Sequence, residues 1–301
     1  MPAARVAAYA KLNLALRILA REASGFHDLE TLFCRIALAD DVVVRVDDST
    51  DRVLFCTGEA LPAGGLGPDE ENLAWRAAVA YGAYDNWPRG FSIEIDKRIP
   101  VGGGLGGGSA DAGAVLRALN ALNPRPLPAG ELLAIAGTLG ADVPFLTSET
   151  PLALAWGRGD RMLALPALPV RDVALVLPPH PVSTAEAYGW LAASRTTMTA
   201  PPHRSVLHPL AAVTTWDGVA RLSANDFEPV VFEQRRELAH VYERLAGVDG
   251  VAVARMSGSG STLFALFDGE LQLREVTQAT GCRALATTTL DEVPLVGVDL
   301  S

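Results

Sequence analysis

Hydrophobic residues alternate with polar ones over most of the first fifty residues, a period that predicts β-strands. Three segments show it, residues 5–19, 29–38 and 40–46. Turn-forming pairs are predicted to separate them at Ser24-Gly25 and Asp40-Asp41. A further half-buried strand is predicted over 91–96, where apolar and polar residues alternate again. The N-terminal part of the chain is therefore expected to form a sheet.

Apolar residues at helical spacing predict helices on both sides of a run of glycines. The first covers 71–84. The second begins near Ser109, which with Asp111 gives an N-terminal signature, and the Pro-rich segment after residue 122 stops it. A short third helix over 129–140 is expected to end at a glycine, and 141–146 is expected to turn into extended chain.

The second half of the chain repeats this mixture of strands and helices. Strands are predicted over 151–165, 170–179 and 251–267, the last as a pair joined by a small-residue turn, and helices over 184–193 and 228–247. Residues 195–209 are expected to form a loop. We therefore predict a mixed α/β (α+β) fold with two domains, an N-terminal domain over 1–153 and a C-terminal domain over 154–301.

The composition is typical of a globular chain with a sizeable core, since 49% of the 301 residues are hydrophobic and 20% are charged. Charged residues such as Arg5 and Lys11 interrupt the N-terminus, and no run of about 18 uncharged apolar residues occurs, so neither secretion nor membrane spanning is expected. The cysteines Cys34, Cys56 and Cys282 are far apart. A cytoplasmic protein is the expectation.

The net charge of −10 argues against nucleic acid as a partner, because binding a phosphate backbone needs a basic face. Small anions stay compatible with this charge, since a few lysines and a helix N-terminus form a local positive pocket. The five histidines lack ligand spacing, which argues against a structural zinc site.

The most informative stretch is "PVGGGLGGGSADAG" (100–113), which holds seven glycines and leads into the second helix. Glycines let backbone N–H groups approach an anion, and the helix N-terminus adds positive charge, so a phosphate site is predicted. Gly102, Gly104 and Gly107 also fit the G-x-G-x-x-G of a dinucleotide-binding turn, but a second helix follows where that fold needs a strand. A Walker A loop is excluded because Ser109 occupies the lysine position.

The glycine run also resembles the phosphate loop of the GHMP small-molecule kinases, through Pro100, Gly104-Leu105-Gly106, Gly108-Ser109 and Ala112. The likeness continues in order along nearly the whole chain: "AKLNLAL" (10–16), "GFHDLETLF" (25–33), "ENLAWRAA" (71–78), "LGADVPF" (139–145), "GRGD" (157–160) and "MSGSGSTLF" (256–264). These segments are similar to the members that act on CDP-linked methylerythritol.

This resemblance implies a two-domain fold with an N-terminal ATP-binding domain and the active site in the cleft between the domains. It implies transfer of the γ-phosphoryl group of ATP to the 2-hydroxyl of 4-diphosphocytidyl-2-C-methyl-D-erythritol, giving the 2-phosphate and ADP. That reaction is a step of the non-mevalonate route to isoprenoids.

The resemblance assigns roles that the sequence pattern alone does not. It makes Asp142 the catalytic acceptor of the alcohol proton and places Lys11 beside it, whereas from pattern alone they are a turn former and an edge-strand charge. Asn13, on the same strand face as Lys11, is expected to contact the substrate. The expected ATP-binding residues are Pro100, Val101, Gly102, Gly103, Gly104, Leu105, Gly106, Gly107, Gly108, Ser109, Asn72 and Lys97. The alternative to ATP binding is that Asn72 is only a residue at the N-terminus of a helix. For Lys97, the alternative is a solvated strand end.

The resemblance also implies a cytosine pocket, in which Phe26 stacks, His27 forms a hydrogen bond and Tyr188 supplies the opposing ring. The alternative for Phe26 and Tyr188 is ordinary core packing. The family usually has tyrosine at position 26, and phenylalanine keeps the stacking surface. Gly258 and Gly260 either close the cleft over the substrate phosphates or form only a tight hairpin.

Magnesium is expected with ATP because the phosphate charge must be neutralised, and Ser109 is the one ligand assigned. The expected partners are the small-molecule substrate and ATP, with no nucleic acid and no membrane, in a monomer or homodimer. Three rival hypotheses remain: another GHMP kinase acting on mevalonate, homoserine or a sugar, an NAD-dependent dehydrogenase, and a non-catalytic nucleotide-binding module.

Overall fold

The chain forms two β-sheets in the computed structural model, which describes residues 1–21, 27–159, 161–197 and 212–300. The larger sheet has seven strands in the order β11-β1-β2-β4-β3, with β5 paired to β2 and β6 paired to β5. Its strands are β1 (Ala3–Arg21), β2 (His27–Asp47), β3 (Arg52–Thr57), β4 (Gly90–Asp96), β5 (Leu152–Gly157), β6 (Arg161–Ala164) and β11 (Gly297–Asp299). The smaller sheet has four strands in the order β10-β7-β9-β8: β7 (Asp172–Leu177), β8 (Val251–Met256), β9 (Leu263–Phe267) and β10 (Arg283–Thr288).

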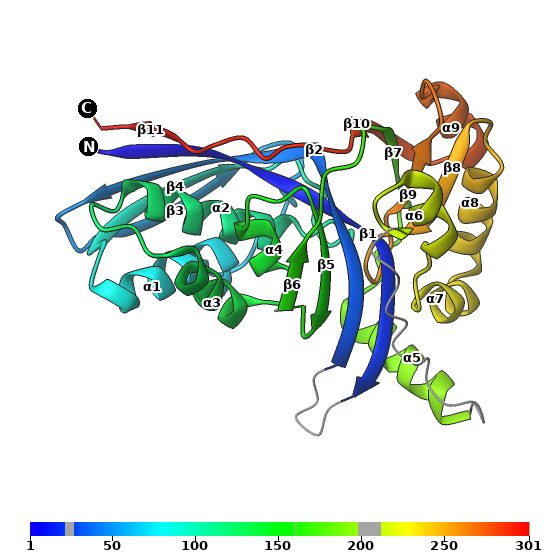
Figure 1. The fold of residues 1–301 in the computed structure, drawn as a ribbon, viewed down its shortest axis with the longest axis horizontal. Helices are drawn as coiled ribbons and strands as arrows, with labels where there is room; N and C mark the ends of the chain where they lie inside the picture. Colours follow the sequence, from blue (N-terminus) through cyan, green and yellow to red (C-terminus); the bar gives the residue numbers. More distant parts are fainter. Residues whose placement is uncertain (22–26, 160, 198–211, 301) are drawn as a thin grey trace.

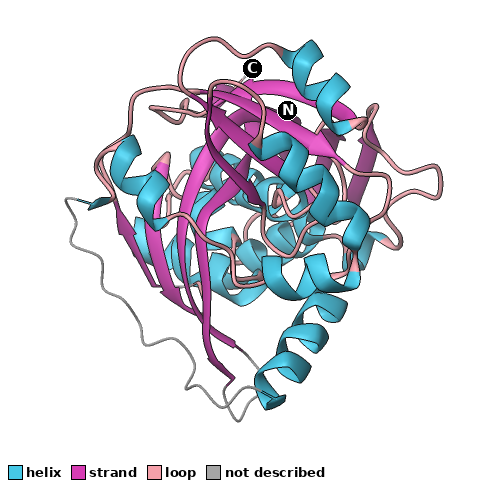
Figure 2. Cartoon of the chain, turned by 90° about the vertical axis from the view of Figure 1, so that its right-hand side faces the viewer, coloured by secondary structure: helices cyan, strands magenta, loops and turns pink. Residues whose placement is uncertain are grey.

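Helices cover these sheets, which confirms the predicted mixed α/β fold. One face of the larger sheet carries α1 (Leu73–Asp85), α2 (Gly107–Leu122), α3 (Ala129–Leu139) and α4 (Val143–Thr147), as Figure 1 shows. The rest of the chain contributes the short 3₁₀-helix η1 (Asp69–Glu71), α5 (Thr184–Thr197), α6 (Trp216–Leu222), α7 (Glu228–Gln234), α8 (Arg236–Ala246) and α9 (Leu273–Thr280). The side view of Figure 2 shows these helices packed around the strands. In the part of the chain described, no helix is long and apolar enough to cross a membrane.

The long hairpin of β1 and β2 is irregular where it passes the centre of the molecule. Its antiparallel register shifts between Tyr9 and Lys11 and again between Asn13 and Ala15. Such bulges bend a strand and redirect its side chains and backbone groups. As a result, the backbone N–H of Lys11 donates to the carbonyl of Leu105, in the glycine run, at 3.0 Å.

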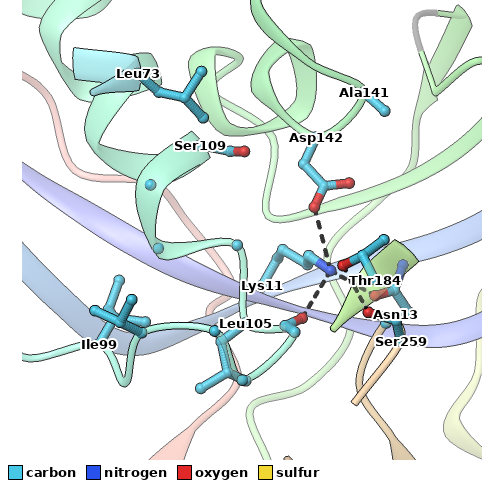
Figure 3. A pocket seen from close by; sticks show the side chains of 18 of the residues that line it. Lys11, Asn13, Leu73, Ile99, Leu105, Ser109, Ala141, Asp142, Thr184 and Ser259 are labelled. Carbon is cyan, nitrogen blue, oxygen red and sulfur yellow. Dashed lines mark hydrogen bonds and ion pairs between the residues drawn. The ribbon is translucent and has the colours of Figure 1, made fainter. Parts of the chain in front are cut away.

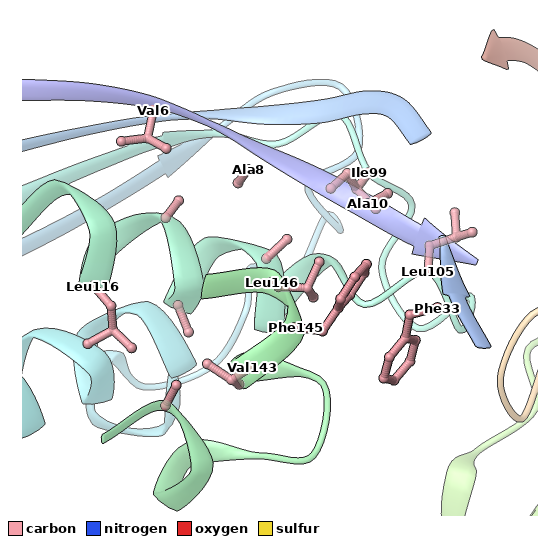
Figure 4. Packing of buried hydrophobic residues seen from close by; sticks show 14 of the residues in the cluster. Val6, Ala8, Ala10, Phe33, Ile99, Leu105, Leu116, Val143, Phe145 and Leu146 are labelled. Atoms are coloured by element: carbon pink, nitrogen blue, oxygen red, sulfur yellow. The ribbon is translucent and has the colours of Figure 1, made fainter. Parts of the chain in front are cut away.

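The main hydrophobic core lies between the larger sheet and the helices α1, α2 and α4. Figure 4 shows Phe145 of α4 against Phe33 of β2, with their ring centroids 4.9 Å apart and nearly parallel. A second core joins the smaller sheet to α7, α8 and α9. The two cores place the glycine run, which connects β4 to α2, between the two sheets.

Two sequence predictions about local structure are wrong, and a third is wrong in part, because residues 195–197 of the predicted loop belong to α5. The rest of that loop and the predicted turn at Ser24-Gly25 lie outside the described residues. The predicted turn at Asp40-Asp41 is continuous strand, because Asp40 is buried and accepts hydrogen bonds from the backbone N–H groups of Arg98 and Ile99. The segment 141–146 does not extend but forms α4, with Pro144 in its first turn, where a proline is compatible with a helix.

The predicted domain limits of 1–153 and 154–301 stay a prediction. Pairing in the larger sheet runs past residue 153, because β5 and β6 cover 152–164 and both belong to it. The chain also returns to this sheet at its other end, where β11 pairs with β1.

Candidate active site

A cavity of about 580 Å³ opens where the glycine run meets β1, the start of α4 and the β8–β9 turn. Most of the residues predicted as functional line it: Lys11, Asn13, Asn72, Lys97, Pro100, Val101, Gly102, Gly103, Gly104, Leu105, Gly106, Gly107, Gly108, Ser109, Asp142, Tyr188 and Gly258. Sequence segments more than two hundred residues apart therefore contribute to one site.

The glycine run follows a path that only glycine can take at several points. Gly102, Gly104 and Gly106 have φ angles of 77°, 78° and 74°, in the left-handed region. A Cβ atom at Gly104 would lie 2.1 Å from the carbonyl oxygen of Ser257, in the β8–β9 turn. The backbone of the loop therefore packs directly against the backbone of the β8–β9 turn. Helix α2 begins directly after the loop, and the first N–H groups of a helix have no partner within it. This arrangement suits an anion such as phosphate.

Lys11 and Asp142 meet at the centre of the cavity (Figure 3). The Nζ of Lys11 lies 3.3 Å from Oδ2 of Asp142 and donates to the carbonyl oxygen of Gly104 at 2.9 Å. The Lys11 side chain is 4% exposed, so its interpretation as an exposed edge-strand charge is wrong. The Asp142 side chain is 30% exposed, which leaves its carboxylate open to a ligand in the cavity.

Asn13 supports this pair from the same strand face, as the sequence predicted. Its Oδ1 accepts from Nζ of Lys11 at 2.6 Å, and its Nδ2 donates to the hydroxyl of Thr31 at 2.8 Å. The Thr31 hydroxyl in turn donates to the carbonyl of Ala15. Because each of these groups has a partner, the lysine ammonium is held in one place before any ligand binds.

The predicted cytosine pocket is described only in part. Tyr188 of α5 lines the cavity and packs edge-on against Phe227, with ring centroids 4.9 Å apart. Burial raises the pKa of its phenol, and the nearby charge of Asp142 adds to this. Phe26 lies outside the described residues, as does the side chain of His27, whose backbone begins β2.

The β8–β9 turn forms another wall of the cavity through Gly258 and Ser259. The Ser259 hydroxyl lies 3.0 Å from that of Thr184, at the start of α5, and sequence analysis singled out neither residue. Gly260 does not line the cavity, and a Cβ atom at this position would lie 2.6 Å from the sulfur of Met256. Both glycines have φ in the left-handed region, 58° at Gly258 and 90° at Gly260.

Asn225, also missed from the sequence, holds this turn in place. The residue is 4% exposed, and its Nδ2 donates to the carbonyls of Met256 and Gly258 at 2.7 and 2.8 Å. Its Oδ1 accepts from the backbone N–H of Phe227 at 2.9 Å. No local signal in "SANDF" marks its role in the turn, since the two carbonyls that it binds lie more than thirty positions away.

Asn72 and Lys97 both lie on the cavity wall but are engaged with other protein groups. The side chain of Asn72 caps α1 by accepting from the N–H of Ala74 at 2.9 Å, so the predicted helix-terminal role is confirmed. The Nζ of Lys97 forms ion pairs with Asp40 and with Oδ2 of Asp111, the latter at 2.6 Å. Lys97 is 2% exposed, so it is not a solvated strand end.

Asp111 is the least satisfied polar residue of this cluster. Its Oδ1 is buried and has no hydrogen-bond partner among the described residues. Burial raises the pKa of Asp111 to about 7 despite the opposing charge of Lys97. Burial also lowers the pKa of Lys97, but its two carboxylate neighbours outweigh that effect and raise it.

No group of three or more His, Cys, Asp or Glu side chains within the described ranges could hold a metal ion. The cavity instead offers scattered oxygen atoms, the hydroxyl of Ser109 and the carboxylate of Asp142. This set suits a cation that a phosphate-bearing ligand brings with it, because Mg²⁺ is often bound through one or two protein oxygens plus substrate phosphates.

The fold and the site together define a GHMP kinase. The family model described as GHMP kinases N terminal domain matches residues 72–149, and the one described as GHMP kinases C terminal matches residues 208–284. A homoserine kinase structure from Cytophaga hutchinsonii superposes with a TM-score of 0.68 over 99% of this chain and 97% of that one, and its 18% identity makes this a likeness of fold.

Closer relatives narrow the class. A 4-diphosphocytidyl-2-C-methyl-D-erythritol kinase from Desulfotalea psychrophila is 36% identical over 91% of this chain and 90% of its own length. One from Geobacter metallireducens is 37% identical over 90% of this chain and 91% of its own. A crystal structure of a 4-(cytidine 5'-diphospho)-2C-methyl-D-erythritol kinase superposes with a TM-score of 0.74 at 37% identity, covering 95% of this chain and 98% of that one. The chain belongs to the 4-diphosphocytidyl-2-C-methyl-D-erythritol kinase family.

Proposed function

We propose that this chain transfers the γ-phosphoryl group of ATP to the 2-hydroxyl of 4-diphosphocytidyl-2-C-methyl-D-erythritol, giving the 2-phosphate and ADP. Family membership makes the chain an ATP-dependent small-molecule kinase. The observation that carries phosphoryl transfer to an alcohol is the Lys11–Asp142 pair, which faces the same cavity as the glycine run. The choice of the cytidylyl acceptor is supported by the relatives at 36–37% identity. The step belongs to the non-mevalonate route to isoprenoids.

Phosphoryl transfer needs positioned phosphates and an acceptor for the alcohol proton, but no covalent enzyme intermediate. The backbone of residues 102–108 and the start of α2 would cradle the phosphates of ATP. Asp142 would accept the proton of the substrate hydroxyl, since its carboxylate is open to the cavity.

Lys11 would stabilise the charge that develops on the attacking oxygen. Its ammonium is fixed by Asn13, Gly104 and Asp142, so no reorganisation is needed during the reaction. The contact with Gly104 also joins the ammonium to the phosphate loop. This contact would keep Asp142, the proton acceptor, at a fixed distance from the γ-phosphoryl group of ATP.

The cytidine end of the substrate would bind near Tyr188, with Phe26 and His27 completing the pocket as the sequence predicts. Tyr188 is braced by Phe227, so its ring is already oriented in the cavity wall. Ser259 and Gly258 line the same cavity as this ring and the Lys11–Asp142 pair, and the diphosphate would pass along them.

We expect Mg²⁺ to enter with ATP and to bind near Ser109, whose hydroxyl stands at the start of α2. When bound, it would neutralise the phosphate charge. Oligomeric state and cytoplasmic placement remain predictions.

The test is release of ADP by the purified protein with Mg-ATP and one of four acceptors: 4-diphosphocytidyl-2-C-methyl-D-erythritol, mevalonate, homoserine or galactose. We expect turnover with the cytidylyl substrate alone. Turnover with another acceptor would reassign the alcohol and keep the ATP site. Absence of turnover with all four would favour a nucleotide-binding module. The dehydrogenase hypothesis is disfavoured, because α2 is followed by α3 and α4 and not by a strand.

A further inference from the structure

Arg35 of β2 is buried without a carboxylate partner. The residue is 1% exposed, and within the described part of the chain it forms no ion pair. Burial lowers its pKa to about 9, which leaves the guanidinium charged at neutral pH. Placing an unpaired charge in a protein core is unfavourable, so the contacts that replace water around this group must be specific.

Those contacts are carbonyl oxygens at the C-terminal end of α4. The Nη2 of Arg35 donates to the carbonyls of Phe145 and Ser148, both at 2.6 Å, and its Nε donates to the carbonyl of Thr150 at 3.0 Å. The last carbonyls of a helix have no partner within it, and a guanidinium presents several donors in a fixed plane. Arg35 therefore fixes both the end of α4 and the segment that follows.

The opposite end of the same helix carries the proposed proton acceptor. Asp142 is the N-cap of α4, which spans only Val143–Thr147, and it contacts Lys11. Lys11 and Arg35 are directly paired across β1 and β2 in the sheet register. Two cations from adjacent strand positions thus hold the two ends of one short helix.

A stack of aromatic rings fills the space between these cations. The Nζ of Lys11 lies 5.7 Å from the centre of the Phe33 ring, and the guanidinium carbon of Arg35 lies 4.9 Å from the centre of the Phe145 ring. Phe33 and Phe145 stack on each other at 4.9 Å, as labelled in Figure 4. Both cations are within the range of a cation–π contact. A shift of α4 along the sheet would disturb every member of this stack.

We propose that Arg35 is a positioning residue for phosphoryl transfer: by binding the carbonyls at the C-terminal end of α4, it sets the position of Asp142 relative to Lys11. The proposal rests on the proposed function of Asp142. Arg35 does not line the cavity, so it acts through the helix and not through contact with the substrate. A displacement of about 1 Å in a catalytic group is enough to lower a rate about 100-fold.

The test compares Arg35→Met, which removes the charge and the donors, with Arg35→Lys, which keeps the charge and fewer donors. We expect kcat to fall about 10- to 100-fold in the methionine variant and about 3- to 10-fold in the lysine variant, with KM for both substrates within about 3-fold of the parent. Unchanged kcat in either folded variant would overturn the proposal, as would a rise in KM that matches the fall in kcat. If Arg35→Met does not fold, Arg35→Lys decides by the same criteria.

Arg117→Met is the matched control for burial. Arg117 is also buried, at 5% exposed, and its charge adds to the effect of burial in lowering the pKa of Arg35. Its Nη2 donates to the carbonyl of Pro294, away from the cavity and not in α4. It should lose stability in thermal unfolding without loss of kcat. Equal loss of kcat in this variant would mean that destabilisation alone explains the effect.

Combining Arg35→Met with Asp142→Asn separates the two proposals. If Arg35 acts through Asp142, the kcat of the double variant should lie within about 3-fold of the kcat of Asp142→Asn alone. Independent, multiplying effects would overturn the positioning role and leave the base assignment intact. Wild-type kcat in Asp142→Asn would instead remove the base assignment, and the inference with it.

Discussion

The ammonium of Lys11 lies 3.3 Å from the carboxylate of Asp142, and this contact joins β1 to the start of α4, whose first residue, Val143, lies 132 positions after Lys11. The carboxylate is partly open to the cavity while the ammonium is enclosed. The pair therefore has one member that is free to meet a substrate hydroxyl and one that holds it in place.

Replacing Asp142 by Asn should lower kcat about 100- to 10,000-fold, because the amide keeps the shape of the carboxylate but accepts no proton from the alcohol. KM for the cytidylyl substrate should stay nearly unchanged, as expected when an interaction specific to the transition state is lost. Steady-state ADP release measures both. Asp268→Asn serves as control, since Asp268 is 62% exposed and pairs with Arg171 outside the cavity. Equal loss in kcat and in affinity would contradict the role of a base.

Replacing Gly104 by Ala should destabilise the protein more than replacing Gly102. The two glycines share the same left-handed φ, at 78° and 77°, so each substitution introduces backbone strain of about 1–2 kcal/mol. Only the Cβ of residue 104 would meet another atom closely, the carbonyl of Ser257 at 2.1 Å, which adds about 1–3 kcal/mol of overpacking. Urea unfolding of both variants gives the difference. Equal stabilities would mean that the loop moves away from the β8–β9 turn at little cost.

Replacing Tyr188 by Ala should raise KM for the cytidylyl substrate by the equivalent of about 1–3 kcal/mol, the scale of a lost stack on a base. KM for ATP should not change. Tyr188→Phe keeps the ring against Phe227 and should bind nearly as well as the parent. If the alanine variant loses stability but not affinity, Tyr188 belongs to the core alone.

Stability should depend on pH through Asp111, whose pKa rises from 3.8 to about 7 on folding. Between these values the unfolded chain has lost the proton that the folded chain keeps, so this group's contribution to stability falls as pH rises from about 4 to 7. Asp111→Asn does not titrate. We therefore expect the free energy of unfolding of the parent, relative to this variant, to decrease over that range. Chemical unfolding of both proteins at several pH values tests this. A difference in unfolding free energy that does not change with pH would mean that Asp111 is not the group responsible.

Sequence analysis predicted the phosphate loop from a local pattern, a glycine run before a helix, whereas the roles of Lys11 and Asp142 came from the family resemblance. One of its errors has a clear physical cause. Asp40-Asp41 has the residues of a turn, but burial against Lys97 and the backbone of 98–99 keeps it in a strand. Long-range pairing outweighed local propensity there.

The residues that sequence analysis missed have contacts that depend on how distant segments of the chain are aligned. Arg35 meets α4 because bulges in β1 and β2 set it opposite Lys11, and one residue of slippage would turn it to the other face. Asn225 binds the carbonyl of Met256, at the end of β8, and the N–H of Phe227, which precedes α7. Neither relation leaves a periodic trace in the chain, so both required the three-dimensional structure.

The pairing of β11 with β1 has a consequence for biosynthesis. Ala3 of β1 lies opposite Asp299 of β11, so this part of β1 gains its partner only after β11 has been synthesised. Throughout translation the outer edge of that segment is exposed, and unpaired strand edges are sites where nascent chains associate wrongly. The larger sheet is complete only when β11 has left the ribosome and paired with β1.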